Sequence, residues 1–247
     1  MAGKDYWEKR ALGIHAQYGH DTSDYRSVVG AAIEAFDRND SRPLRILDFG
    51  CGSGRLIPVY FDLAGEGVIE HATLYDISLT ALNLAVKRAE GVGAMDICSF
   101  ISDPDCLRRA GRYDLIVSAR ALSAVEPQDI SATMKELSSL ADMIYLDEMV
   151  PSEYPGYDGG YWYLHDFPAI MKELGFTVID GTSGRLYGRE LVGVDPEDEY
   201  AEAEEADEWA DEGSVEDCID RLDDEWYNEP SENEWEDEDA DWGRSYQ

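Results

Sequence analysis

The chain is poor in basic residues. Its 247 residues include 20 Lys and Arg against 54 Asp and Glu, which gives a formal net charge of −34. The few basic side chains do not gather into a stripe that would neutralise a phosphate backbone. We therefore expect no direct binding to nucleic acid.

Long apolar runs are also missing. No run approaches the roughly 20 residues that span a bilayer, and the opening "MAGKDYWEKR" carries charges where a signal peptide needs an apolar core. We expect a cytoplasmic location without a membrane anchor. The four cysteines form neither a CxxC pair nor a Cys/His zinc spacing, so no metal site is expected.

The composition changes once, near residue 194. Residues 195–247 hold 25 of the 54 Asp and Glu residues and only two Arg, which accounts for −23 of the net charge. Such charge density opposes a second core, so residues 195–247 are expected to form a disordered acidic tail. Four of the six tryptophans lie there, which leaves open the binding of a basic protein partner.

Residues 23–194 alternate short apolar segments with helical patterns. The segments that read as buried strands are 44–49, 71–76, 97–101, 113–119 and 142–148. The segments that read as helices are 23–36, 55–64, 78–90, 128–141 and 166–175. Repeated strand-to-helix units predict a Rossmann-like, doubly wound α/β fold with a mostly parallel sheet. Residues 176–194 read as an antiparallel hairpin at its edge.

The first strand runs into a glycine-rich turn, "DFGCGSGR". In doubly wound sheets, ligands bind beyond the carboxyl ends of the strands. A P-loop needs a Lys, and none is near this turn. A dinucleotide fingerprint needs a third glycine where Arg55 stands, so the pattern is GxGxG, with Asp48 before it.

The second strand ends in Asp76. A carboxylate at this place can accept hydrogen bonds from both hydroxyls of a ribose. The alternative is an acid favoured by the helix dipole at the start of the next helix. With the glycine turn, Asp76 favours a nucleoside-bearing cofactor.

These residues resemble the class I S-adenosylmethionine-dependent methyltransferases. The resemblance extends over residues 25–194, through "LDFGCGSGR", "LYDIS", "FISDPDCL" and "YDLIVSARAL". It implies S-adenosylmethionine as the cofactor and a methyltransferase domain at residues 23–194. Residues 1–22 would then form an N-terminal helical segment that closes over the cofactor, or else an amphipathic helix that only packs on the domain. The residues implied for cofactor binding are Asp48, Gly50, Cys51, Gly52, Gly54, Asp76, Ile77, Asp103, Ser118 and Ala119.

The resemblance also implies individual roles. Asp48 and the glycine turn would flank the methionine part and the ribose, while Ile77 would pack on the adenine. Asp103 would meet the adenine amino group, although "SDPD" is also a good turn sequence. Arg120, after the fourth strand, would border the methyl acceptor.

The loop after the fifth strand, "DEMVPSEYPGYDGGYWYLHD", is where the resembled family recognises its acceptor. The candidate substrate residues are Arg120, Glu148, Tyr161 and Tyr163. His165 is the candidate catalytic base, because its imidazole titrates near neutrality. The alternative is that His165 merely precedes Asp166, the N-cap of the next helix.

The sequence therefore predicts a methyltransferase acting on an oxygen or nitrogen atom, with a small-molecule acceptor first and a basic protein second. Where enzymes that methylate exocyclic base nitrogens carry NPPY or DPPY, this chain has "SARA". One alternative is an acidic adaptor or nucleic-acid mimic, non-catalytic or dual-role, built on a methyltransferase fold. A weaker one is an NAD(P)-dependent enzyme.

Overall fold

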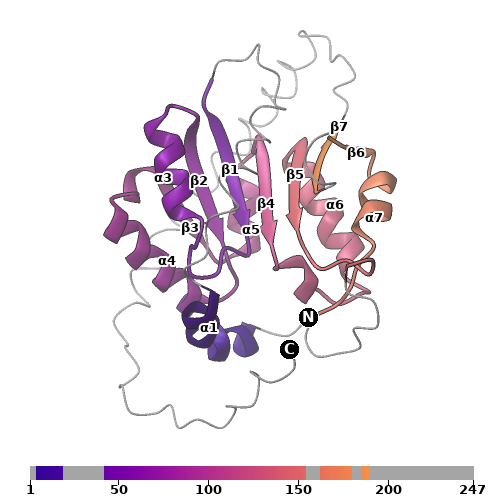
Figure 1. The fold of residues 1–247 in the computed structure, drawn as a ribbon, viewed down its shortest axis with the longest axis horizontal. Helices are drawn as coiled ribbons and strands as arrows, with labels where there is room; N and C mark the ends of the chain where they lie inside the picture. The colour runs from indigo at the N-terminus through magenta and orange to yellow at the C-terminus, as the bar shows by residue number, and fades with distance from the viewer. Residues whose placement is uncertain (1–3, 19–41, 154–161, 180–184, 190–247) are drawn as a thin grey trace.

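The computed structural model describes residues 4–18, 42–153, 162–179 and 185–189. Its centre is a seven-stranded sheet in the order β3-β2-β1-β4-β5-β7-β6 (Figure 1). The strands are β1 Leu44–Phe49, β2 Ile69–Tyr75, β3 Cys98–Ile101, β4 Leu115–Ala119, β5 Met143–Asp147, β6 Phe176–Val178 and β7 Leu186–Arg189. The first five are parallel, and β7 pairs antiparallel with both β5 and β6. The Rossmann-like fold with an antiparallel hairpin edge is confirmed.

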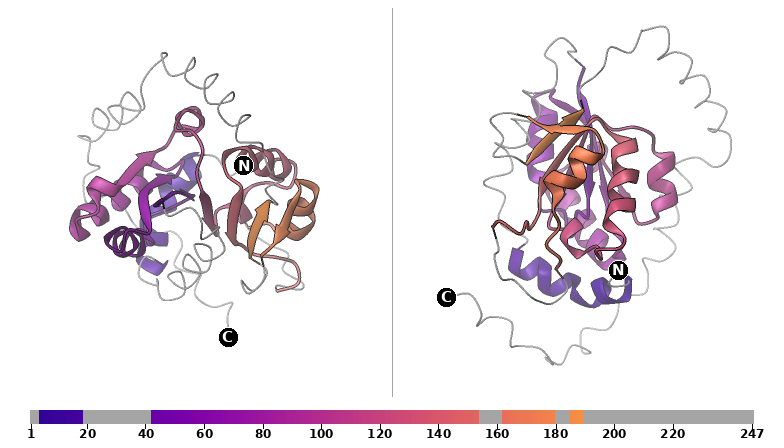
Figure 2. Two further views of the ribbon diagram at one scale, coloured as in Figure 1. Left: turned by 90° about the horizontal axis from the view of Figure 1, so that it is seen from above. Right: turned by 90° about the vertical axis from the view of Figure 1, so that its right-hand side faces the viewer.

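Helices cover both faces of this sheet (Figure 2). The helices are α1 Lys4–Tyr18, α3 Ile57–Gly65, α4 Leu79–Val92, α5 Pro104–Arg109, α6 Ile130–Leu140 and α7 Phe167–Glu173, with short 3-10 helices η1 Met95–Ile97 and η2 Leu122–Ala124. Ile46 packs with residues of α3 and α4, whereas Leu47 packs with residues of α5, α6 and α7. Because strand residues alternate between two buried faces, the strands read as nearly continuous apolar runs.

Local signals set where the helices begin and end. The Ser78 hydroxyl accepts a hydrogen bond from the Ala81 amide at 3.1 Å and caps α4, which ends at Gly93 with φ +78°. Pro58 lies in the first turn of α3, where its missing N–H costs no helical hydrogen bond. The sequence predicted these starts to within two residues.

Some elements differ from the expectation or lie beyond the structure. "SDPD" is more than a turn, because Asp103 caps the short helix α5. The helix expected at 23–36, the turn of the hairpin and the acidic tail lie outside the described residues. In the described part of the chain, no helix has the length and apolar character needed to cross a membrane.

The strand register aligns four strand ends. Phe49 of β1 pairs with Tyr75 of β2 and with Ser118 of β4, and Ala119 pairs with Asp147 of β5. We call these ends of β1, β2, β4 and β5 the carboxyl edge. Helix α1 lies across this edge in Figure 1 and in the right-hand view of Figure 2. The fold therefore brings the glycine turn, Asp76 and the segments after β4 and β5 to one place.

We predict that Gly54→Ala destabilises the protein by about 1–3 kcal/mol. Gly54 has φ +70°, and a Cβ there would lie 2.3 Å from Ile57 Cδ1 and 2.9 Å from Ala85 Cβ. Gly91→Ala is the matched control, because that helical glycine has no atom within 4 Å of the added Cβ. The control should stabilise α4 by about 0.5–1 kcal/mol. Urea unfolding measures both changes, and equal midpoints for the two variants would contradict this packing.

Candidate functional site

The glycine turn adopts a backbone that only glycine tolerates well. Gly50, Gly52 and Gly54 have φ values of +73°, +55° and +70°. The amides of Gly50 and Cys51 both donate to the Tyr75 carbonyl oxygen, at 2.7 and 3.0 Å. A Cβ on Gly50 would lie 2.1 Å from Ala121 Cβ, whereas a Cβ on Gly52 would meet open space. The turn thus packs closely on one side and leaves room at Gly52.

Asp76 joins the glycine turn to the start of α4. Its Oδ2 accepts a hydrogen bond from the Gly52 amide at 2.9 Å, and its Oδ1 accepts one from the Ser78 amide at 2.9 Å. Burial raises the pKa of Asp76, and these two hydrogen bonds oppose that rise. Each carboxylate oxygen keeps a further lone pair, so Asp76 can still accept hydrogen bonds from a ligand.

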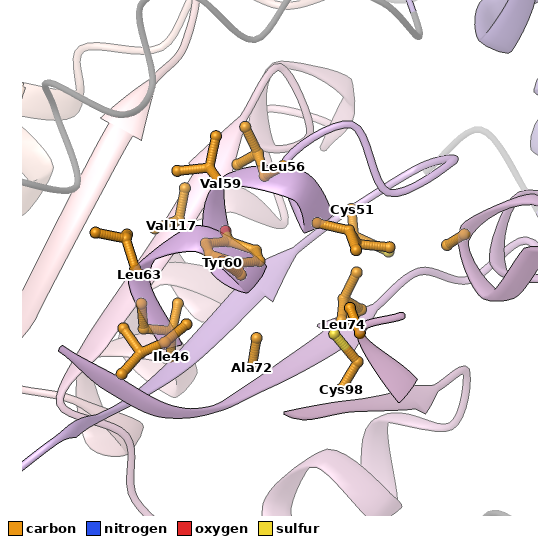
Figure 3. Close-up of a cluster of buried hydrophobic side chains, with 14 of the residues drawn as sticks. Ile46, Cys51, Leu56, Val59, Tyr60, Leu63, Ala72, Leu74, Cys98 and Val117 are labelled. Atoms are coloured by element: carbon orange, nitrogen blue, oxygen red, sulfur yellow. The ribbon is translucent and has the colours of Figure 1, made fainter. Parts of the chain in front are cut away.

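A buried carboxyl group lies beneath the turn. Asp48 is 2% exposed, and neither its Oδ2 nor the Tyr60 hydroxyl has a hydrogen-bond partner of normal geometry among the described residues. Burial raises the pKa of Asp48 to about 7, with Arg55 and Tyr60 opposing the rise and Asp76 adding to it. Cys51 and Tyr60 belong to the same cluster of buried side chains (Figure 3). The Cys51 thiol therefore faces the core, and its backbone is the part in the turn.

A second buried carboxylate organises the segment after β4. Glu148 is 2% exposed. Its donors are the hydroxyls of Ser118 at 2.8 Å and Ser123 at 2.7 Å and the amides of Ala121 at 2.9 Å, Leu122 at 3.0 Å and Ser123 at 2.9 Å. Burial raises the pKa of Glu148, and these hydrogen bonds oppose that rise. An acceptor could reach Glu148 only by displacing one of these donors.

This network fixes a strained residue beside the glycine turn. Arg120, with φ +66°, is the one non-glycine residue of positive φ in the described ranges. Its amide donates to the Asp147 carbonyl oxygen at 3.1 Å, and the next three amides all donate to Glu148. Such strain at the end of a strand is typical of functional sites.

The segment after the fifth strand packs along η2. The Tyr163 amide donates to the Ser123 carbonyl oxygen at 2.6 Å, and His165 Nε2 lies 2.8 Å from the Val125 carbonyl oxygen. Since a carbonyl oxygen only accepts, Nε2 carries the hydrogen and Nδ1 is the nitrogen left to accept a proton. Burial lowers the pKa of His165, so its imidazole is neutral at pH 7. Tyr161 lies outside the described residues.

The remaining predicted residues lie around the carboxyl edge. Ser118 is fully buried, and Ala119 ends β4. The Asp103 carboxylate accepts a hydrogen bond from the Asp105 amide at 2.9 Å. Ile77 packs against a core cluster that includes Tyr75, whose ring stacks on Phe49 at 5.1 Å between centroids.

Helix α1 supplies residues that sequence reasoning missed or left open. The Trp7 ring lies 5.9 Å from that of Trp162, between centroids. Glu8 contacts the start of α4, and no pattern in the sequence links these two places. In the described part of the chain, no group of three or more His, Cys, Asp or Glu side chains is placed to hold a metal ion.

We predict that Asp48 makes stability pH-dependent. Because burial raises its pKa from about 3.9 in an unfolded chain to about 7, the folded state binds this proton more tightly. The stabilisation by protonated Asp48 is full below about pH 4 and is lost as pH rises through about 7. Asp48→Asn should therefore gain stability relative to the wild type between pH 4 and 7 in urea unfolding. Asp96→Asn, which removes the same charge from an exposed site, is the control variant.

Residues 46–142 match the family model described as a methyltransferase domain. A search of curated protein sequences found no significant match. Magnesium protoporphyrin IX methyltransferase from Synechocystis PCC 6803, crystallised with bound S-adenosylmethionine, is 22% identical, with a TM-score of 0.54 over 76% of this chain and 95% of that chain.

Two further structures share the fold. WbdD, a bifunctional kinase-methyltransferase, is 16% identical, with a TM-score of 0.53 over 74% of this chain and 43% of that chain. An O-methyltransferase family protein from Burkholderia thailandensis is 15% identical, with a TM-score of 0.52 over 77% of this chain and 60% of that chain. The family match runs from β1 to the end of α6 and so includes the glycine turn and Asp76. Residues 46–142 therefore match a methyltransferase domain, and the chain shares the fold of solved methyltransferases.

Proposed function

We propose that the carboxyl edge holds S-adenosylmethionine between the glycine turn and Asp76, and that the chain methylates an oxygen or nitrogen atom of a small molecule. One observation carries the proposal. Asp76 accepts a hydrogen bond from the Gly52 amide, so the acidic side chain lies beside a glycine whose outer face is open. A ribose on Asp76 would thus bring the rest of the cofactor along the turn.

Two features of the described residues fit this cofactor. No atom lies within 4 Å of a Cβ added at Gly52, so the glycine leaves open space that a larger residue would fill and that a ligand can use. Asp48 Oδ2 is a buried acceptor without a partner of normal geometry among the described residues, beside the same turn. A carboxyl group there complements a ligand that bears positive charge.

The other cofactor residues have proposed places along the same edge. Ile77 follows Asp76 directly and would pack on the adenine. Asp103 uses one carboxylate oxygen to cap α5, which leaves the other oxygen for the adenine amino group. Ser118 and Ala119, at the end of β4, would border the methionine part.

When bound, S-adenosylmethionine supplies a methyl group that is already activated toward nucleophiles. The residues of the chain then need chiefly to align the acceptor and to exclude water. Glu148 would help to align the acceptor indirectly, because it fixes Ala121, Leu122 and Ser123 beside the glycine turn. Arg120, in the strained turn after β4, and Tyr163, beside η2, are the proposed contacts to the acceptor.

His165 is proposed to take a proton from an acceptor that is still protonated. Its Nε2 is engaged with Val125, so the proton would go to Nδ1. Burial keeps the imidazole neutral by lowering its pKa, which leaves that nitrogen able to accept. At 5% exposure, His165 is reached only by an acceptor that enters the space beside η2.

A compact acceptor fits this edge best. Helix α1 lies across it, and the Trp7 contact with Trp162 joins α1 to the segment that holds Tyr163. A net charge of −34 opposes a nucleic-acid acceptor. The Synechocystis protein that shares the fold is named for a small-molecule acceptor, magnesium protoporphyrin IX.

We predict that the full-length protein binds S-adenosylmethionine and that Asp76→Asn weakens binding about tenfold, the typical effect of losing a hydrogen bond to a charged group. Titration calorimetry measures both affinities. Asp96→Asn, which changes an exposed acid of η1 between α4 and β3, is the control of equal charge and should bind like the wild type. Equal affinity of Asp76→Asn and the wild type would contradict the assignment of Asp76. Tighter binding of a nicotinamide dinucleotide would favour the alternative of an NAD(P)-dependent enzyme.

The acceptor class is tested by measuring S-adenosylhomocysteine production. The full-length protein is incubated with S-adenosylmethionine and either a small-molecule extract or a fraction of basic proteins. We expect product with the extract alone. Product with the basic proteins alone would contradict a small-molecule acceptor and support the second choice.

A further inference from the structure

Glu8 of α1 caps a helix that begins 71 residues later in the chain. Its Oε1 accepts a hydrogen bond from the Leu79 amide at 2.6 Å. Its Oε2 accepts one from the Thr80 amide at 3.0 Å and one from the Ser78 hydroxyl at 3.1 Å. The first amides of a helix have no partner within the helix, and a negative charge there also faces the positive end of the helix dipole. Glu8 therefore completes the start of α4 from outside that helix.

The turn that Glu8 holds is the one that carries Asp76. The Ser78 amide donates to Asp76 Oδ1, while the Ser78 hydroxyl donates to Glu8 and accepts from the Ala81 amide. Ser78 thus connects two carboxylates, one from α1 and one from the end of β2. Ile77 lies between Asp76 and Ser78, so its backbone is fixed from both sides.

Helix α1 is anchored on the opposite side of the edge as well. Trp7, next to Glu8, contacts Trp162 with ring centroids 5.9 Å apart. Ala11, one turn further along α1, is buried. Because Glu8 contacts the start of α4 and Trp7 contacts the segment after β5, α1 spans the carboxyl edge (Figure 1).

We propose that Glu8 is a positioning residue for the cofactor. By capping α4 from α1, it holds Asp76 and Ile77 where the ribose and the adenine would bind. This inference rests on the proposed function of the carboxyl edge. Glu8 acts through Ser78 and the first turn of α4, so it needs no contact with the cofactor.

The test compares S-adenosylhomocysteine affinity in full-length variants by titration calorimetry. Glu8→Ala removes all three hydrogen bonds at the α4 start and should weaken binding about tenfold. Glu8→Gln keeps one acceptor oxygen and should fall between Glu8→Ala and the wild type. Asp5→Asn removes the same charge from an exposed site in the first turn of α1 and should leave the affinity unchanged. Thermal unfolding of each variant confirms that it is folded.

Hydrogen exchange separates a role in binding from a role in the fold alone. The amides of Leu79 and Thr80 should exchange faster in Glu8→Ala than in the wild type and in Asp5→Asn. Faster exchange with unchanged affinity would show that the contact supports only the fold, and unchanged exchange would show that Glu8 does not cap α4. Either result overturns the inference. A wild-type protein that binds neither S-adenosylmethionine nor S-adenosylhomocysteine instead overturns the proposed function, and the role of Glu8 with it.

Discussion

The contact between the Asp76 carboxylate and the Gly52 amide is the constraint on which the rest of the site depends. It ties the turn after β1 to the end of β2, while the other oxygen of Asp76 holds the start of α4 through Ser78. Gly50, whose φ is +73°, lies two residues before the Gly52 amide in the turn that brings this amide to the carboxylate. The contact places the Asp76 carboxylate beside the open face at Gly52.

Three carboxylates shape the carboxyl edge by accepting hydrogen bonds from backbone amides. Asp76 holds the glycine turn, Glu8 holds the start of α4, and Glu148 accepts five hydrogen bonds from β4 and residues 121–123. A buried carboxylate with several donors is stable because each donor offsets part of the cost of burial. In a chain of net charge −34, these three acids are structural acceptors rather than surface charge.

The sequence was sufficient to predict the sheet and the meeting of the glycine turn with Asp76 at one edge. Buried parallel strands have continuous apolar runs, and the GxGxG turn and Asp76 each follow such a run. Because β1 and β2 are parallel neighbours, their carboxyl ends lie at the same edge of the sheet. Helix α5 was missed because it has six residues and begins with a turn-like "SDPD". The role of Glu8 could not be predicted because its contact joins positions 71 residues apart, and no sequence pattern at either position indicates that contact.

The acceptor side was less predictable from sequence. The place of Glu148 after the fifth strand makes it a candidate substrate residue in the sequence, yet its burial and its five donors in β4 and residues 121–123 follow from tertiary packing. The residue type of His165 makes it a candidate base, but the hydrogen bond to Val125 leaves only Nδ1 for proton transfer. In both cases the residue type was visible in the sequence and the partners were not.

A crystal structure of the full-length protein with S-adenosylhomocysteine tests the central claim most directly. The account predicts both ribose hydroxyls within hydrogen-bond distance of Asp76, and the homocysteine part along Gly50 to Gly54. A ligand bound away from the carboxyl edge, or a ribose that makes no contact with Asp76, would contradict it.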